Sequence, residues 1–274
     1  MAAILCAHLL RQVDGQLIDL LRSLSPAEWD LQTIAPMWKV RDVAAHLLDT
    51  VLRKLSLVRD SCSVEAVEIR SPQDVVALVN RLNREGVAVY RRLSPAILID
   101  LMATACEQSA NFHESLDPFA PAAFAVSWAG EEQSLNWFDT ARELTERWHH
   151  QQQIRLATNR PGIMEPELYH PVLDCFLRGL PFLYRDINAP EGTAILVEIS
   201  GEAGGTWKLV RKPAGWELVD ETSGDASARV TIPQDLAWRI FTKGIDRATA
   251  REQVQLEGDA TLGEQLLHLT AIVA

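Results

Sequence analysis

Apolar residues follow the period of an α-helix through the first two thirds of the chain. Near the N-terminus, Leu9, Val13 and Leu17 lie four residues apart, so they share one face of a helix. The same spacing predicts further helices in the segments 38–60, 71–93, 94–116, 134–157 and 166–187. Long helices joined by short connections pack most readily as a bundle. The pattern therefore predicts an all-α N-terminal domain.

Residues that begin or interrupt a helix mark the ends of several of these segments. Ser-Pro pairs stand at 71–72 and 94–95. They are typical helix starts, because the Ser side chain caps the first turn and Pro fits its backbone angle. Pro171 and Pro181 should kink or divide the segment 166–187.

One predicted connection, residues 117–134, is long. It contains two prolines, a glycine and three aromatic residues without a sustained period. Loops of this length inside compact domains are often binding loops or lids. The alternative is a surface loop whose aromatic side chains cover the edge of the bundle, and the sequence leaves both open.

The pattern changes near residue 190. Short segments rich in β-branched residues follow, separated by turns that contain glycine. They are AILVEIS, WKLVRK, WELVDE, ARVTIP and VQLEG. Two helical segments, 233–244 and 261–273, accompany these strands. We therefore expect a helical bundle over residues 1–188 and a small α+β domain over residues 189–274.

Charge and composition narrow the possible partners. The net charge is −11, which argues against the clustered positive charge that nucleic-acid binding requires. Charged residues interrupt the apolar N-terminal segment well before the roughly 20 residues that cross a membrane, and it lacks the pattern of a signal peptide. We expect a cytoplasmic protein that binds neither nucleic acid nor membrane.

The four cysteines are distributed singly. Cys6, Cys62, Cys106 and Cys175 are far apart and form no CxxC pair. This spacing fits neither a disulfide framework nor a structural zinc site. We expect four reduced thiols.

The segment TERWHHQQQIR, residues 145–155, carries the candidate chemistry. Glu146 and His150 are four residues apart on a predicted helix, so their side chains point the same way. His149 is a rival to His150. Carboxylate oxygen and imidazole nitrogen are good ligands for zinc and other divalent ions. The best candidate for a third ligand is His46, which flanks an apolar stripe in WKVRDVAAHLLD.

An ordinary structural role could also explain these residues. Glu and His at helical spacing are common on exposed helix faces, and a histidine beside the core is usually hydrogen-bonded there. Spacing alone does not decide between these interpretations.

The two segments together resemble the metal-binding domain of the mycothiol-dependent maleylpyruvate isomerases, a branch of the DinB-like four-helix bundles. That family has Trp and Asp before His on one helix, and Glu-x-x-x-His-x-x-x-Ile on another. The matching residues here are Trp38, Asp42, His46, Glu146, His150 and Ile154. The match favours His150 over His149 as the ligand. Gln153 stands where many members have Asp, which leaves the contacts that support the ligands undefined.

The resemblance implies a divalent metal, most often zinc, held by His46, Glu146 and His150 with open positions for water or substrate. It also implies a low-molecular-weight thiol, such as mycothiol, that is activated at the metal and adds to an electrophilic small-molecule substrate. The chain would then be a metal-dependent isomerase or S-transferase. The ligand set does not identify the substrate.

The C-terminal segment is similar to the sterol-carrier-protein-like domain that such isomerases often carry. No residue in it matches a known substrate-binding arginine, although Arg229, Arg239 and Arg247 are available. A second hypothesis is therefore a non-catalytic binding protein, with an apolar small molecule or lipid in this domain and a structural or vestigial metal site. The charged positions in WKLVRK and WELVDE predict a well-filled domain without a large apolar tunnel, which favours the enzyme.

Overall fold

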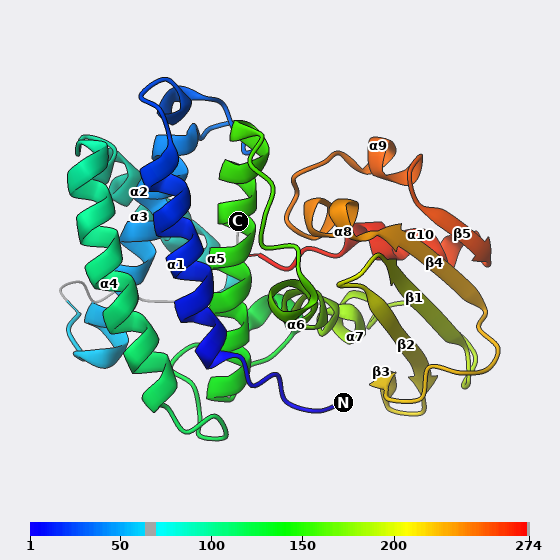
Figure 1. The fold of residues 1–274 in the computed structure, drawn as a ribbon. Coiled ribbons are helices and arrows are strands. Elements are labelled where there is room, and N and C mark those ends of the chain that lie inside the picture. The colour runs from blue at the N-terminus through cyan, green and yellow to red at the C-terminus, as the bar shows by residue number, and fades with distance from the viewer. Residues whose placement is uncertain (64–69, 273–274) are drawn as a thin grey trace.

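The computed structural model describes residues 1–63 and 70–272. Figure 1 shows a helical part and a sheet part side by side. The main helices of the first part are α1 (Ala7–Ser23), α2 (Val40–Lys54), α3 (Pro72–Tyr90), α4 (Pro95–Ser115) and α5 (Asn136–Thr158). The predicted fold class, an all-α region followed by an α+β region, is confirmed.

Four of these helices surround a common core. Both α1 and α2 pack against both α4 and α5, and α3 packs against α2. The predicted apolar face of α1 is buried, since Leu9, Val13 and Leu17 are at most 3% exposed. Burial of such a stripe is the main source of helix stability in a folded domain. The N-terminal pattern therefore identified the core-facing side correctly.

The predicted Ser-Pro helix starts are present. The Ser71 hydroxyl accepts a hydrogen bond from the Asp74 backbone N–H, and the Ser94 hydroxyl accepts one from Ile97. The start of α2 is fixed differently, because the Asp42 carboxylate accepts the backbone N–H of Lys39 at 3.0 Å. Each contact satisfies a backbone donor that the helix itself cannot pair.

The segment 166–187 is divided, although not at Pro171. Helix α6 (Pro166–Leu177) continues through Pro171, and the break falls before α7 (Leu180–Leu183), where Pro181 occupies the first turn. Buried packing of α6 outweighs the single backbone hydrogen bond that Pro171 removes. The prediction that proline divides this segment therefore holds for Pro181 only.

The second part is a five-stranded sheet with helices. Its strands are β1 (Ala194–Ser200), β2 (Gly205–Lys212), β3 (Gly215–Val219), β4 (Ala228–Pro233) and β5 (Gln255–Gly258). Their order is β3-β2-β1-β4-β5, with β1 and β4 parallel and the other pairs antiparallel. Alternate residues of β4 are buried, as a sheet with one covered face requires.

Helices α8 (Gln234–Phe241) and α10 (Ala260–Gln265) pack against the sheet. The short helix α9 (Arg247–Arg251) was not predicted. The predicted final helix, 261–273, is too long, because α10 gives way to a 3₁₀ turn, Leu266–His268. The chain beyond it pairs with α8 instead, through a hydrogen bond from the Ala271 N–H to the Phe241 carbonyl.

One aromatic stack joins the two parts. Trp148 of α5 stacks on Tyr169 of α6, with ring centroids 4.2 Å apart, and meets Trp238 of α8 edge-on at 6.1 Å. The Tyr169 hydroxyl donates to the Gln234 carbonyl at 2.6 Å. Helix α5, which carries the candidate motif, is therefore fixed from the bundle side and from the sheet side.

The long connection 117–134 covers part of the bundle edge, one of its two expected roles, and its role as a binding loop or lid stays a prediction. Trp128 packs against the core, edge-on to Phe138 at 6.1 Å. Phe119 and Phe124 remain exposed. Part of the loop thus covers the bundle, while two of its aromatic rings face solvent.

All four cysteines lie in the described residues as free thiols, three of them buried and Cys62 exposed. Within the same residues, no helix combines the length and the apolar character that crossing a membrane would take.

Candidate metal centre

The packing of α2 against α5 brings three predicted ligands together. His46 lies near the middle of α2, and Glu146 and His150 lie one turn apart on α5. One potential ligand atom from each residue lies within 4.8 Å of the others. The imidazole rings of His46 and His150 meet edge-on, with centroids 4.6 Å apart. Side chains separated by a hundred residues of sequence thus converge on one point.

The group is enclosed on one side and open on another. His46 is 4% exposed and His150 is 7% exposed, whereas the side chain of Glu146 is 26% exposed. The ring of Trp38 covers both histidines, with its centroid 4.5 Å from that of His46 and 5.8 Å from that of His150. Glu146 is therefore the most exposed of the three side chains.

A hydrogen bond fixes the orientation of His150. Its Nδ1 lies 3.0 Å from the Gln153 side-chain oxygen, which can only accept, so Nδ1 carries the proton. Nε2 is then the ring nitrogen left for a metal, and it lies 3.6 Å from the nearer Glu146 oxygen. Carboxylates commonly hold a metal-binding histidine in place by accepting its other N–H, and Gln153 makes that contact here.

His46 has an unsatisfied polar atom. Its Nδ1 is buried and has no hydrogen-bond partner among the described residues, an arrangement that costs about 1–3 kcal/mol. Burial lowers the pKa of His46 well below its ordinary value, and the neighbouring His150 adds to the effect. The ring is therefore neutral at physiological pH, which is the form that binds a metal.

Glu146 is ionised. Burial raises its pKa, but the neighbouring His150 and His149 outweigh that effect, and the net pKa lies below the ordinary value. Two imidazoles beside one carboxylate provide the nitrogen and oxygen donor atoms that zinc prefers. Zinc–ligand bonds of about 2.0–2.2 Å place ligand atoms about 3–3.5 Å apart, so small side-chain rotations would suffice. The residues present fit a divalent metal.

His149, the rival ligand, has a different role. It lies outside the group of three, and its Nδ1 donates to the Thr145 carbonyl at 2.8 Å. Its ring packs on His150 with centroids 4.0 Å apart, and burial lowers its pKa to about 3. His149 therefore supports His150 by packing in its neutral form.

A buried ion network lies next to the centre along the same helices. Lys54 of α2 contacts Asp139 at 2.8 Å and Glu143 at 3.1 Å. Arg147 forms ion pairs with Asp14 of α1 and, at 3.6 Å, with Glu143. Sequence analysis missed this network, whose only signal is charged residues at core-facing helical positions. It cross-links α1, α2 and α5, and so holds the two ligand-bearing helices in register.

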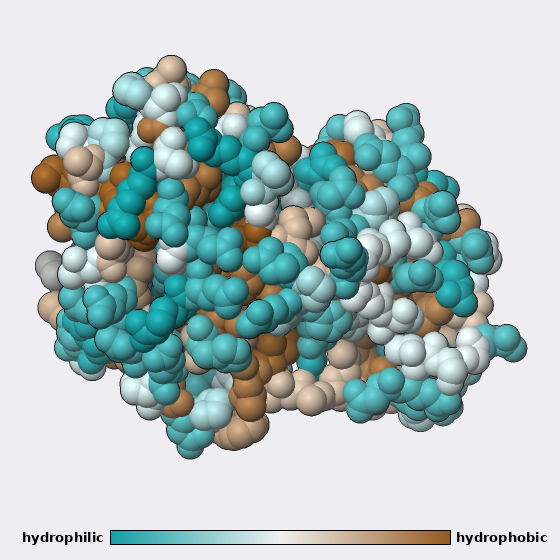
Figure 2. Space-filling view, viewed as in Figure 1, coloured by the Kyte–Doolittle hydropathy of each residue, from teal (hydrophilic) through white to brown (hydrophobic). Residues whose placement is uncertain are grey.

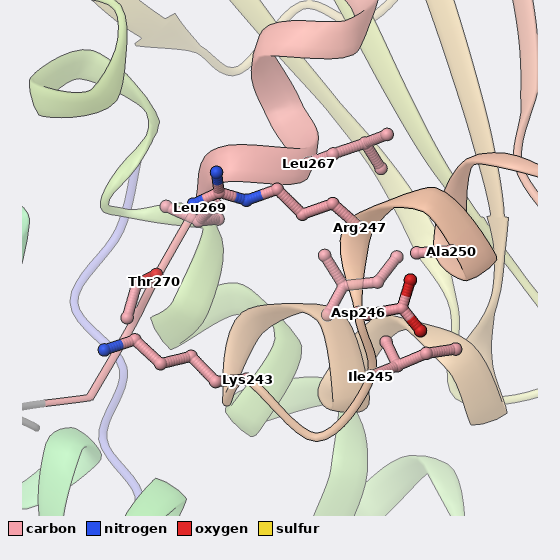
Figure 3. Close-up of a pocket in the computed structure, with 9 residues that line it drawn as sticks. Lys243, Ile245, Asp246, Arg247, Ala250, Leu267, Leu269 and Thr270 are labelled. Carbon is pink, nitrogen blue, oxygen red and sulfur yellow. The ribbon is translucent and has the colours of Figure 1, made fainter.

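The arginines considered for the sheet part have separate environments. Arg229 pairs with Glu198 at 3.5 Å, and Arg239 pairs with Asp235 at 3.5 Å. Arg247 lines a small pocket between α8, α9 and the 3₁₀ turn, together with Lys243 and an apolar wall that includes Leu267 (Figure 3). The pocket holds about 120 Å³ and includes none of the three candidate ligands.

Comparison with known proteins gives one family and two similar folds. Residues 10–155 match the family model "Mycothiol maleylpyruvate isomerase N-terminal domain". The chain superposes on a crystal structure of a histidine-to-alanine mutant of the mycothiol-dependent maleylpyruvate isomerase. The superposition covers 95% of this chain and 98% of the isomerase chain, with a TM-score of 0.56 and 12% sequence identity. Another crystal structure of that isomerase covers 88% and 91%, with a TM-score of 0.53 and 12% identity. At this identity the likeness shows the fold alone. None of the curated proteins matches the chain.

Proposed function

The chain belongs to the mycothiol maleylpyruvate isomerase family, and from this premise we propose that it is a metal-dependent enzyme that uses a low-molecular-weight thiol. One observation carries the proposal: His46, Glu146 and His150 place their ligand atoms within 4.8 Å of one another. The buried and unpartnered Nδ1 of His46 and the oriented ring of His150 support it. Three ligands with an open side are typical of catalytic rather than structural zinc.

A zinc ion held by these three residues would supply thiol activation. Coordination to zinc would lower the pKa of a bound thiol, so that its thiolate is available at neutral pH. Trp38 and His149 enclose the histidines, which keeps water away from the buried side. The partly exposed Glu146 marks the side from which thiol and substrate enter.

We propose cis–trans isomerisation of a conjugated double bond as the reaction. The thiolate sulfur bonds to one carbon of the double bond, and the displaced electron pair moves to the conjugated carbonyl group. Rotation about the resulting single bond follows. Return of the electron pair expels the thiolate and leaves the trans isomer, so the thiol is not consumed. An S-transferase would share the first step and retain the thiol in its product.

The domain organisation belongs to the same proposal. We assign the metal-binding domain to residues 1–188 and a sterol-carrier-protein-like domain to residues 189–274, a division that falls between the end of α7 and the start of β1. The alternative function, binding of a lipid in the C-terminal domain, would need more space than the pocket beside Arg247 offers. The pocket of about 120 Å³ is well below the roughly 300–1,000 Å³ of typical small-molecule sites.

The direct test is thiol-dependent turnover. Purified zinc-loaded protein is mixed with maleylpyruvate, with and without mycothiol, and loss of the cis isomer is followed by absorbance. We expect turnover only with thiol, and a loss of at least about a hundredfold in Glu146→Gln, since an altered ligand removes the metal chemistry. Glu167→Gln, an exposed change on α6, is the matched control. Turnover without thiol, or undiminished turnover in Glu146→Gln, would contradict the proposal.

A further inference from the structure

The loop that carries Trp38, residues 31–39, connects the two parts of the molecule. Figure 2 shows these parts as two lobes in contact, with a notch in the outline between them. Ile34 of the loop packs against the core cluster that contains Phe241 of α8, whereas Trp38 packs against the core of the bundle. One short loop therefore links the sheet part to the wall of the candidate metal centre.

Ile34 meets the sheet part at Gly244. This glycine lies in the turn after α8, between Lys243 and Ile245 (Figure 3). A Cβ atom added at Gly244 would lie 2.7 Å from Ile34 Cδ1, so the absence of a side chain there makes room for Ile34. The Gly244 N–H donates to the Arg239 carbonyl at 2.7 Å, which closes the end of α8. Ile34 thus rests on a fixed point of the sheet part.

Hydrogen bonds make the loop a stiff connection between Ile34 and Trp38. The Gln32 side-chain amide donates to the carbonyl oxygens of Ala35 and Trp38, both at 2.9 Å. The Thr33 hydroxyl donates to the same Trp38 carbonyl at 2.7 Å and accepts from the Ala35 N–H at 3.2 Å. A displacement of Ile34 therefore reaches Trp38, because the backbone between them is held as one unit.

The orientation of His46 depends on Trp38. His150 is held by its hydrogen bond to Gln153, but the buried Nδ1 of His46 has no partner among the described residues. Packing holds the His46 ring instead, with its centroid 4.5 Å from that of Trp38 and 4.6 Å from that of His150. Groups around a metal site set its affinity by fixing the orientation of the ligands. Trp38 therefore does for His46 what Gln153 does for His150.

We infer that Ile34 is a positioning residue of the metal centre, and that the sheet part acts through it on His46. Gly244 supports Ile34, and the hydrogen-bonded loop joins Ile34 to Trp38. Trp38 in turn orients His46. The inference rests on the proposed function for the role of His46 as a ligand. It gives the sheet part a task in that function, because this part then supports metal binding without supplying a ligand.

The first test overfills the contact between Ile34 and Gly244 in the full-length protein. Gly244→Leu places a side chain where Ile34 lies, and should push Trp38 away from His46. We expect the NMR signals of the His46 and His150 rings to shift in the metal-free protein, because an aromatic ring alters the chemical shifts of the rings that it covers. Zinc binding, measured by competition with a chelator, should weaken by about tenfold.

Gly215→Leu is the matched control for this substitution. It adds the same side chain to the sheet part, at a position where an added Cβ atom has nothing within 4 Å in the described structure. We expect unchanged histidine signals and a zinc affinity within about threefold of the wild type.

Two further variants separate positioning from a general loss of folding. Ile34→Ala removes the contact without crowding it, and should shift the same histidine signals. In the double variant Ile34→Ala, Gly244→Leu, the leucine fills the space that the isoleucine left, so the signals should return toward those of the wild type and the zinc affinity to within about threefold.

Unchanged His46 signals in folded Gly244→Leu and Ile34→Ala proteins would overturn the inference. So would a double variant that recovers neither the signals nor the affinity. A wild type without zinc affinity would contradict the proposed function, whereas the signals of the metal-free protein test the coupling of Ile34 to His46 by themselves.

Discussion

Gln153 is expected to control the affinity of the metal centre through His150. In Gln153→Leu, the acceptor 3.0 Å from His150 Nδ1 is lost, and both residues are buried. The metal-free protein can relieve this by moving the ring or shifting its proton. The metal-bound protein must keep the Nδ1 proton in place without an acceptor, which costs about 1–3 kcal/mol. The expected result is zinc binding weaker by about tenfold to a hundredfold.

A charge change at the same position should act in the opposite direction. In Gln153→Glu, a carboxylate replaces the amide oxygen, and it strengthens the hydrogen bond and the basicity of Nε2. We expect zinc binding at least as tight as in the wild type. Gln152→Leu serves as the matched control, because it breaks a similar hydrogen bond, to the Gly162 carbonyl at 2.8 Å, on the same helix but away from His150.

The affinities are measured by competition with a chromophoric zinc chelator, after circular dichroism shows that each variant is folded. We expect the zinc affinity to fall in the order Glu, Gln, Leu at position 153, with Gln152→Leu close to the wild type. A folded Gln153→Leu protein with wild-type affinity would refute it. So would a loss in Gln152→Leu as large as that in Gln153→Leu.

Three further predictions concern stability and the ligands. Lys54→Met should lower the free energy of unfolding by about 3–5 kcal/mol in urea titrations, because it leaves the buried Asp139 and Glu143 with one cation fewer. The control is Arg251→Met, which breaks the exposed pair of Arg251 with Glu264 and should cost less than about 1 kcal/mol. Equal effects of the two substitutions would contradict a buried network. Burial lowers the pKa of His113 to about 3, so its contribution to stability is full above its ordinary pKa and declines as the pH falls. From about pH 7.5 to 5.5 the free energy of unfolding of the wild type should fall by about 1.4 kcal/mol more than that of His113→Gln. If the two free energies changed with pH in parallel, His113 would not be the group responsible. His46→Ala should abolish zinc binding while His149→Gln weakens it by no more than about tenfold, and the reverse order in the chelator assay would make His149 the ligand.

Local sequence patterns predicted much of the fold correctly. The spacing of Leu9, Val13 and Leu17 identified a buried helix face, and the Ser-Pro pairs identified the starts of α3 and α4. These signals are local, because periodicity and capping depend on residues within one or two turns. The end of the chain was predicted less well, since the shortening of the last helix depends on a contact of Ala271 with Phe241.

The candidate site was likewise predictable where the signal is local and unpredictable where it depends on distant residues. Helical spacing put Glu146 and His150 on one face, and the place of His46 beside an apolar stripe made it the best candidate for the third ligand. Only the family pattern favoured His150 over His149. The role of Gln153 and the network around Lys54 were not predictable. Lys54 and Asp139 are 85 positions apart, and nothing in the local sequence of either residue indicates the other.

The most direct test of the metal centre is anomalous diffraction at the zinc edge from crystals grown with zinc. The arrangement of α2 and α5 predicts one strong peak per chain, bonded to His46, Glu146 and His150 at about 2.0–2.2 Å. Density that shows these three side chains joined only by hydrogen bonds, with no peak between them, would contradict the existence of the centre.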